Sequence, residues 1–139
     1  MSFVLDSSVA LSWCFEDEHT PPAIALLHEV AGTGAIAPAL WPLEVLNGLA
    51  MAERRGRLDR ERRHKTAALL RELPVEIDVE TASHAWSETA ALAERFRLTL
   101  YDAAYLELAR RRSMPLATLD EDLRRAAASA GVKVLGHAP

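Results

Sequence analysis

Short apolar runs alternate along this chain with stretches in which apolar residues recur every three or four positions. The runs predict buried strands, and the spaced residues predict helices with one apolar face. Strands are expected at residues 3–5, 35–38, 75–79, 114–119 and 132–135. Apolar residues alternate with acids in 75–79, so we expect that strand to be short or at a sheet edge. The order of elements predicts an α/β fold with a mostly parallel sheet and helices on both faces.

Helix boundaries follow from capping residues and helix breakers. Helices are expected at residues 9–15, from Pro21 to Gly32, from Pro42 to Gly56, from Asp59 to Pro74, at 81–96, at 100–112 and after Asp120 up to Gly131. Ser7 or Ser8 is expected to cap the first of these helices. The clearest helical pattern lies in 81–96, where one apolar face carries Ala82, Trp86, Thr89, Ala93 and Phe96. Helix 100–112 is apolar on most sides, which predicts a central position.

Length and composition set the class of protein. The chain has 139 residues, which predicts one domain, residues 1–139, with a core of its own. Cys14 is the only cysteine, which excludes an internal disulfide framework and fits a reducing compartment. The sequence has no signal-peptide pattern and no apolar run long enough to span a bilayer. We therefore expect a cytoplasmic protein without membrane contact.

Four acids fall at places where a parallel sheet would bring them together. Asp6 and Asp120 end apolar strands, while Glu44 and Asp102 lie in the first turns of predicted helices. Each has an ordinary structural explanation as a helix cap or as a partner of the helix dipole. However, all four lie within apolar sequence, where a charge is seldom buried without a partner. Strand tips and helix starts share one edge of a parallel sheet, so the four acids are expected to converge there.

Converging carboxylates repel one another unless a cation neutralises them. An all-oxygen ligand set favours Mg²⁺, with Mn²⁺ as the alternative, and the dispersed histidines argue against zinc. A divalent ion held by carboxylates commonly activates water for attack on a phosphodiester. Polar residues beside the acids are candidates to support ligands and waters: Ser7, Ser8, Asn47 and Thr118. Asp122 is a fifth acid, which either reaches the site or is a solvated residue in the first turn of its helix.

Four motifs resemble those of the PIN-domain nucleases, and most closely those of the VapC-type toxins of toxin–antitoxin pairs. The motifs are Phe3-Val-Leu-Asp-Ser-Ser-Val9, Pro42-Leu-Glu-Val-Leu-Asn47, Leu98-Thr-Leu-Tyr-Asp-Ala-Ala-Tyr105 and Leu116-Ala-Thr-Leu-Asp120. The resemblance implies a three-layer sandwich of helices around a short sheet, and a Mg²⁺- or Mn²⁺-dependent endoribonuclease. It also implies a homodimer that an antitoxin blocks. On matching positions, the catalytic and metal-binding acids are Asp6, Glu44, Asp102 and Asp120.

Basic residues are concentrated in the second part of the chain. The net charge is −4, yet residues 1–53 contain no Lys or Arg, and seven of the sixteen basic residues lie between Arg54 and Lys65. A solvated helix face with ion pairs one turn apart explains such a segment by itself. Contacts to RNA or to a protein partner are the alternatives, and both remain open. The candidates are Arg54, Arg55, Arg57, Arg60, Arg63, Arg110 and Arg111.

Two other classes of protein begin with a strand that ends in Asp. The aspartate-based phosphohydrolases need a second Asp two residues later, where this chain has Ser8. A receiver-like Mg²⁺-binding signalling domain needs an adjacent acid pair after the first strand and a Lys after a late strand. Lys133 lies inside the last predicted strand and Lys65 in a helix, so this match is poor.

Overall fold

The computed structural model describes residues 3–137. Five short strands form one sheet at the centre of the molecule. The strands are β1 (Val4–Leu5), β2 (Ala35–Ala37), β3 (Val75–Ile77), β4 (Leu116–Ala117) and β5 (Val134–Leu135). Their order is β3-β2-β1-β4-β5, and every neighbouring pair is parallel. The predicted parallel sheet is confirmed, and β3 is the expected edge strand.

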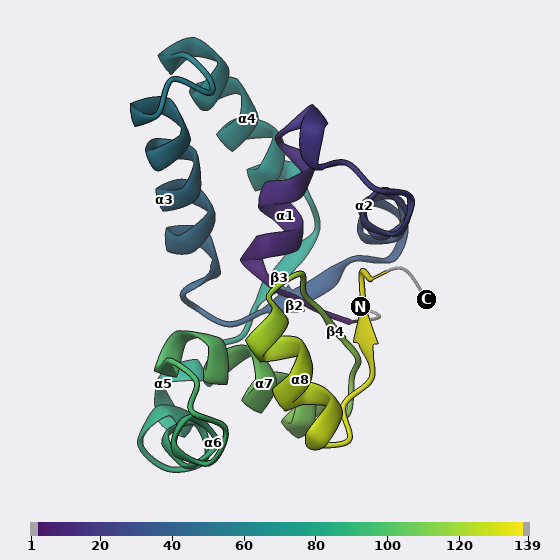
Figure 1. Ribbon diagram of the computed structural model, residues 1–139, viewed down its shortest axis with the longest axis vertical. Coiled ribbons are helices and arrows are strands. Elements are labelled where there is room, and N and C mark those ends of the chain that lie inside the picture. The colour runs from purple at the N-terminus through teal and green to yellow at the C-terminus, as the bar shows by residue number, and fades with distance from the viewer. Residues whose placement is uncertain (1–2, 138–139) are drawn as a thin grey trace.

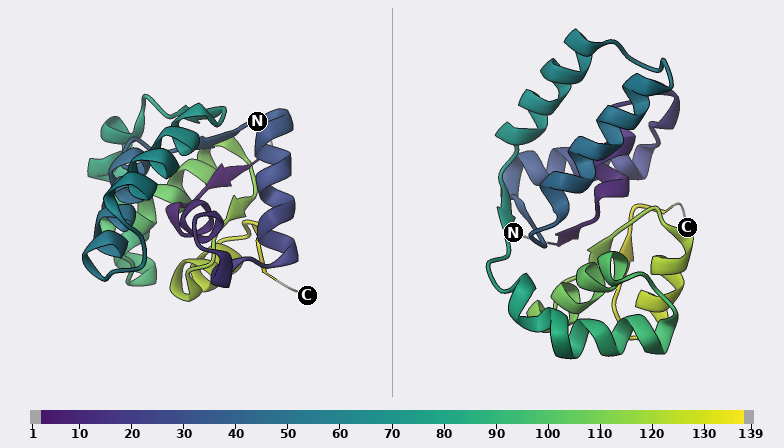
Figure 2. Two further views of the ribbon diagram at one scale, coloured as in Figure 1. Left: turned by 90° about the horizontal axis from the view of Figure 1, so that it is seen from above. Right: turned by 90° about the vertical axis from the view of Figure 1, so that its left-hand side faces the viewer.

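Helices cover both faces of the sheet, which gives three layers (Figure 1, with two further views in Figure 2). One layer contains α1 (Ser7–Trp13), α2 (Pro21–Thr33), α3 (Trp41–Arg54) and α4 (Arg60–Glu72). The other contains α5 (Thr81–His84), α6 (Ala90–Phe96), α7 (Leu100–Arg112) and α8 (Glu121–Ser129). A short 3-10 turn, η1 (Glu16–Glu18), follows α1, and a π-helical turn, η2 (Ala85–Thr89), joins α5 to α6. The predicted α/β sandwich is confirmed.

Successive strands are added first on one side of β1 and then, from β4 onward, on its other side. From β1 the chain moves outward to β2 and β3, and it then crosses back to β4 on the other side of β1. Val4 therefore pairs with Ile36 on one side and with Leu116 on the other. In open parallel sheets, ligands bind outside the carboxyl ends of the strands at such a switch point. Asp6 and Thr118 follow directly after these two strands.

Helix α7 is the central helix, as its apolar sequence predicted. All seven residues from Ala103 to Ala109 are buried, and the helix packs against β1 and β4. Its N-terminus is capped by Thr99, whose hydroxyl accepts a hydrogen bond from the Asp102 N–H. Because the core holds the middle of this helix, the first turn, and therefore Asp102, lies at a defined place.

Two local predictions were wrong. Helix α1 begins at Ser7 rather than Val9, with Asp6 in the capping position, so neither Ser7 nor Ser8 is the cap. In the stretch 81–96, Trp86 is 93% exposed and Ala82 is exposed, whereas Thr89 and Ala93 are buried. The π-helical turn puts an extra residue into the helix at 85–89, so the residues before it no longer share a face with those after it.

Other differences are small. The strands predicted at 114–119 and 132–135 are two residues long in the structure. After β4, the N–H groups of Leu119 and Asp120 donate to the Ser8 and Thr118 hydroxyls, and the chain turns into α8. Asp59 caps α4 as predicted, accepting a hydrogen bond from the Arg62 N–H at 2.8 Å. Among the described residues, no helix has the length and apolar character needed to cross a bilayer.

Candidate active site

Asp6 lies at the tip of β1 and is 3% exposed. Its Oδ2 accepts hydrogen bonds from the Ser8 hydroxyl at 2.6 Å and from the Thr118 hydroxyl at 2.8 Å. Burial nevertheless raises the pKa of Asp6 to about 6, because desolvation outweighs the two hydroxyl donors, and the charges of Glu44 and Asp120 add to the rise. Asp6 is thus a buried acid whose charge lacks compensation.

Ser8 and Thr118 also hold the turn that carries Asp120. The Leu119 N–H donates to the Ser8 hydroxyl at 2.9 Å, and the Asp120 N–H donates to the Thr118 hydroxyl at 3.0 Å. Asp120 itself caps α8, where its Oδ1 accepts a hydrogen bond from the Leu123 N–H. The structure therefore brings the predicted supporting residues Ser8 and Thr118 between Asp6 and Asp120.

Glu44 reaches the same edge from the first turn of α3. Its Oε1 accepts hydrogen bonds from the Ser7 hydroxyl at 3.2 Å and from the Tyr105 hydroxyl at 2.6 Å. Tyr105 is fully buried, and burial beside Asp6 and Glu44 raises its pKa strongly, which keeps the hydroxyl protonated as a donor. Tyr105 was not among the site residues predicted from the sequence, although its place three residues after Asp102 on a largely apolar helix was the available signal.

Asp102 lies in the first turn of α7 and is partly exposed. Burial raises its pKa to about 6, and the negative charges of the other three acids and of Asp122 add to the rise. Thr118 links Asp6 to the turn that carries Asp120, and Tyr105, three residues after Asp102 on α7, donates to Glu44. The four predicted acids therefore converge, from four separate elements.

The cluster contains no internal counter-charge. Within residues 3–137, Asp6, Glu44, Asp102 and Asp120 take part in no ion pair. No three acidic, histidine or cysteine side chains of these residues surround one point closely enough to form a finished metal cage. The donor set, hard oxygens with uncompensated negative charge, fits a divalent cation that would draw the carboxylates together.

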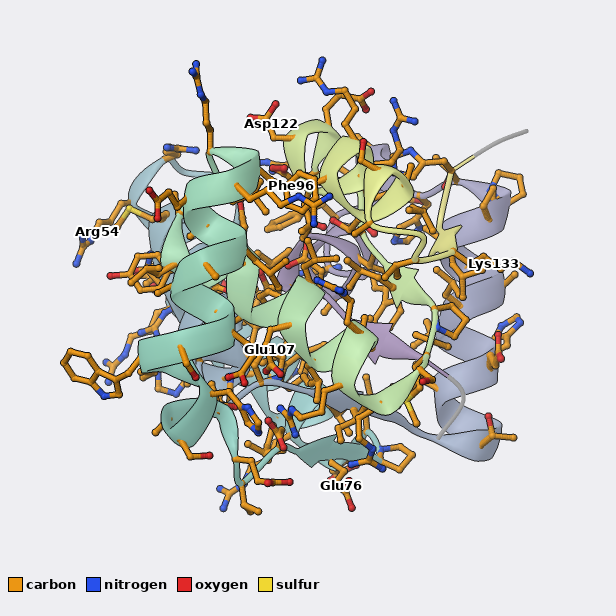
Figure 3. The ribbon with its side chains drawn as sticks, turned by 90° about the horizontal axis from the view of Figure 1, so that it is seen from below. Arg54, Glu76, Phe96, Glu107, Asp122 and Lys133 are labelled. Carbon is orange, nitrogen blue, oxygen red and sulfur yellow. The ribbon has the colours of Figure 1, made fainter. Side chains whose placement is uncertain are left out.

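Two further candidates lie at the margin of the cluster. Asn47, one turn beyond Glu44, is exposed. Asp122 is exposed and pairs with Arg125 at 2.5 Å, while its charge still acts on Asp102. The side-chain view in Figure 3 shows Asp122 on the same side of the molecule as Phe96, at the outer surface.

Three of the seven candidate arginines are held by internal ion pairs. Arg57 pairs with Asp17 at 2.9 Å and with Glu18 at 2.8 Å, and its guanidinium lies 4.0 Å from the centre of the Phe15 ring. Arg63 pairs with Glu53. These contacts join the α3–α4 turn to η1 and α3 to α4.

Arg111 is the most strongly held of the three. It pairs with Asp78 at 2.6 Å, with Glu107 at 2.8 Å and with Glu80 at 3.5 Å, and its side chain is 16% exposed. We therefore assign Arg111 to the fold rather than to a contact surface. In the described part of the chain, the remaining four arginines are exposed and have no ion pair: Arg54, Arg55, Arg60 and Arg110.

The PIN domain family profile matches residues 3–129. This chain belongs to the PIN domain family. The match confirms the resemblance to the PIN-domain nucleases that the four acidic motifs indicated, and it removes support for the receiver-like alternative. A comparison with curated proteins finds no match.

Several solved structures have the same fold. PAE2754 from Pyrobaculum aerophilum is 19% identical with a TM-score of 0.69, covering 96% of this chain and 83% of that chain. VapC20 of Mycobacterium tuberculosis, described as a toxin that cleaves the sarcin–ricin loop, is 17% identical with a TM-score of 0.64. The match covers 94% of this chain and 96% of that chain. A toxin–antitoxin complex from Klebsiella pneumoniae contains a chain that is 18% identical with a TM-score of 0.60, covering 91% of both. At these identities the likeness concerns the fold.

Proposed function

We propose that this PIN domain is a Mg²⁺- or Mn²⁺-dependent endoribonuclease that hydrolyses RNA phosphodiester bonds. The observation that carries the proposal is the cluster of four carboxylates from β1, α3, α7 and the β4–α8 turn, none of which forms an ion pair with a cation among the described residues. Two of these acids, Asp6 and Asp102, have pKa values raised to about 6, so holding them ionised at neutral pH has an energetic cost. Binding of a divalent cation would remove that cost.

Each side chain has a defined part in the proposed site. Asp6 and Asp102 are the most direct ligands, and Glu44 and Asp120 complete the shell, partly through water. A bound cation would supply charge neutralisation at the phosphodiester and a lowered pKa of the attacking water. Ser8 and Thr118 fix the Asp6 carboxylate, while Ser7 and Tyr105 fix Glu44. Hydroxyl donors of this kind orient ligands and tune their basicity.

The Asp6→Asn variant tests the proposal. It should abolish Mg²⁺-dependent cleavage of RNA, because it removes the charge of the most buried ligand while keeping its shape. The fold should remain intact or become slightly more stable, since a buried carboxylate with a raised pKa is lost. Cleavage is followed on a labelled RNA with Mg²⁺, with Mn²⁺ and with EDTA, and unfolding is followed in urea.

A matched control is Glu94→Gln, which removes an exposed acid on α6 that has no ion pair among the described residues. Its cleavage rate should equal that of the unmodified protein. Full activity of Asp6→Asn, or cleavage that continues in EDTA, would show that the proposed mechanism is wrong.

We also propose that the protein is the toxin of a toxin–antitoxin pair and forms a homodimer, as the family resemblance implies. The fold shared with a chain of the Klebsiella pneumoniae toxin–antitoxin complex supports this proposal. A short neighbouring reading frame that encodes a DNA-binding protein, and whose product suppresses RNA cleavage when mixed with this chain, is the expected result. Light scattering of the purified protein tests the dimer.

A further inference from the structure

A small pocket lies beside the acidic cluster, between the C-terminal end of α6 and the outer side of α8. Its volume is about 290 Å³, and it is lined by Phe96, Arg97, Asp122, Arg125, Ala126 and Ser129. Two observations connect it with the cluster. Asp122 lies in the first turn of α8, two residues after the capping residue Asp120, and Arg97 lies five residues before Asp102, in the loop that leads into α7. Figure 3 shows Phe96 and Asp122 at one side of the molecule.

Arg97 gives this pocket a cation without a partner. It ends α6 in the left-handed conformation, with φ of 55°, is exposed, and makes no ion pair among the described residues. Arg125 is the second cation of the pocket and pairs with Asp122 at 2.5 Å. That pair neutralises the one acid of the pocket, and a guanidinium has further N–H donors for another anion. The pocket is therefore positive beside a negative cluster.

Phe96 gives the same pocket an aromatic wall. The ring is partly buried and packs against the core, and the Arg95 guanidinium lies 4.8 Å from its centre. A ring held in this way is a fixed surface, so little conformational entropy is lost when a flat group packs on it. Aromatic rings beside arginines are the usual surface on which proteins stack the bases of single-stranded nucleic acid.

We propose that this pocket holds one nucleotide of single-stranded RNA next to the phosphodiester that is cleaved. The inference rests on the proposed nuclease function. The base packs on Phe96, and Arg97 and Arg125 contact the flanking backbone phosphates. At about 290 Å³ the pocket is at the lower end of the range for small ligands, which suits a single nucleotide. A base paired within a duplex presents no free face to the ring.

This proposal differs from the expectation based on the basic segment 54–65. Arg54 lies ten residues after Glu44 on α3, which places it about 15 Å along the helix from the acidic cluster. Figure 3 shows the Arg54 side chain pointing outward at the margin of the molecule. Arg97 and Arg125, by contrast, line a pocket together with Asp122, which lies two residues after Asp120 of the acidic cluster.

The test compares variants of the pocket with variants of the basic segment. Arg97→Gln removes a cation without leaving an acid unpaired, and Phe96→Leu keeps an apolar contact with the core but removes the aromatic face. Arg54→Gln and Arg60→Gln are the matched controls. Binding is measured by fluorescence anisotropy on a short labelled single-stranded RNA of mixed sequence, and on a duplex of the same sequence. All variants are made in the Asp6→Asn protein with Mg²⁺ so that the probe stays intact.

Phe96→Leu should weaken binding of the single strand about fivefold or more and leave binding of the duplex unchanged. Arg97→Gln should lower the slope of log affinity against log salt by about 0.7, the loss expected for one phosphate contact on a single strand. In the active protein, both should raise KM more than they lower kcat. Arg54→Gln and Arg60→Gln should change binding less than Arg97→Gln does.

Two results would contradict different parts of the argument. If the unmodified protein cleaves RNA but Arg97→Gln and Phe96→Leu bind the single strand as tightly as their parent, the pocket is not a nucleotide site and the nuclease function stands. If the unmodified protein does not cleave RNA, or Asp6→Asn retains cleavage, the proposed function itself is wrong.

Discussion

The Tyr105 hydroxyl helps to fix the orientation of the Glu44 carboxylate in the acidic cluster. Glu44 comes from α3, yet the strongest hydrogen bond to its carboxylate, at 2.6 Å, comes from Tyr105 on α7. Ser7 on α1 donates to the same Oε1 atom. With Oε1 held from two sides, the carboxylate has a fixed orientation, which a metal ligand needs. Tyr105 is therefore a positioning residue of the proposed site.

The Tyr105→Phe variant should retain the fold because the ring still fills the core, while it loses the hydrogen bond to Glu44. We expect Mn²⁺ affinity, measured by calorimetry, to fall about 10- to 100-fold, and kcat to fall with it. Tyr101→Phe on the same helix is the control, since Tyr101 is exposed. If Tyr105→Phe binds Mn²⁺ as tightly as the unmodified protein, the hydroxyl serves only the fold.

At the scale of elements, the two ends of α7 have different roles, one in the acidic cluster and the other in an ion-pair network. The first turn carries Asp102 to the acidic cluster, and the last turn carries Arg111 into a network with Asp78 after β3 and Glu107 one turn back. Asp78 and Glu107 are buried. Burial alone would raise the pKa of Asp78, but the hydrogen bonds from Arg111, the Glu80 N–H and Thr81, together with the Arg111 charge, outweigh it and lower that pKa. The network thus ties α7 to the end of β3 in its charged form.

Replacing Arg111 with Ala should destabilise the protein by about 3–5 kcal/mol, because two buried carboxylates lose their cation. Urea unfolding of Arg111→Ala measures this loss. The neighbouring Arg110 is exposed, and Arg110→Ala should change the free energy of unfolding by less than about 0.5 kcal/mol. Equal effects of the two substitutions would show that the network contributes little to stability.

The π-helical turn shows why one face of a helix was misassigned. The apolar spacing of Ala82, Trp86 and Ala93 fits an uninterrupted α-helix, and such a helix would bury all three. The extra residue in the turn at 85–89 rotates the first part of the helix away from the core, so only Ala93 is buried. The spacing of apolar residues predicts the buried face of a helix only where the number of residues per turn is constant. In this helix that number changes at the π-helical turn, which packs against α7.

At the scale of the molecule, the acidic cluster makes stability depend on pH. In the folded protein the pKa values of Asp6 and Asp102 are about 6, whereas an unfolded Asp titrates near 4. Between pH 6 and pH 4 the folded state therefore binds more protons than the unfolded state, and stability rises as the pH falls through this window. Asp6 contributes up to about 3 kcal/mol, and Asp102 less because it is partly exposed.

We expect the metal-free protein to have a larger free energy of unfolding at pH 5 than at pH 7.5, measured by urea unfolding in EDTA. The Asp6→Asn/Asp102→Asn variant should lose most of this difference, which would assign the difference to these two acids. Addition of Mn²⁺ at pH 7.5 should stabilise the unmodified protein and not the double variant. A larger free energy of unfolding at pH 7.5 than at pH 5 in EDTA would contradict this account of the cluster.

Local sequence patterns are sufficient to predict the layered α/β fold, the order of its elements and the four acids at strand tips and helix starts. These features depend on local patterns: apolar runs, helical spacing, caps and breakers. The convergence of Asp6, Glu44, Asp102 and Asp120 was also predictable, because parallel strands put their carboxyl ends on one edge of a sheet.

The neighbours of these acids, by contrast, depend on the tertiary structure. Tyr105 reaches Glu44 across 61 positions of sequence, and Thr118 reaches Asp6 across 112. The tertiary structure likewise decides that Arg111 is occupied by buried carboxylates while Arg97 has no partner among the described residues. The residue type and the neighbouring sequence do not show whether an arginine such as Arg111 or Arg97 has an acidic partner. The difference arises from long-range packing, which places one beside buried acids and the other beside an open pocket.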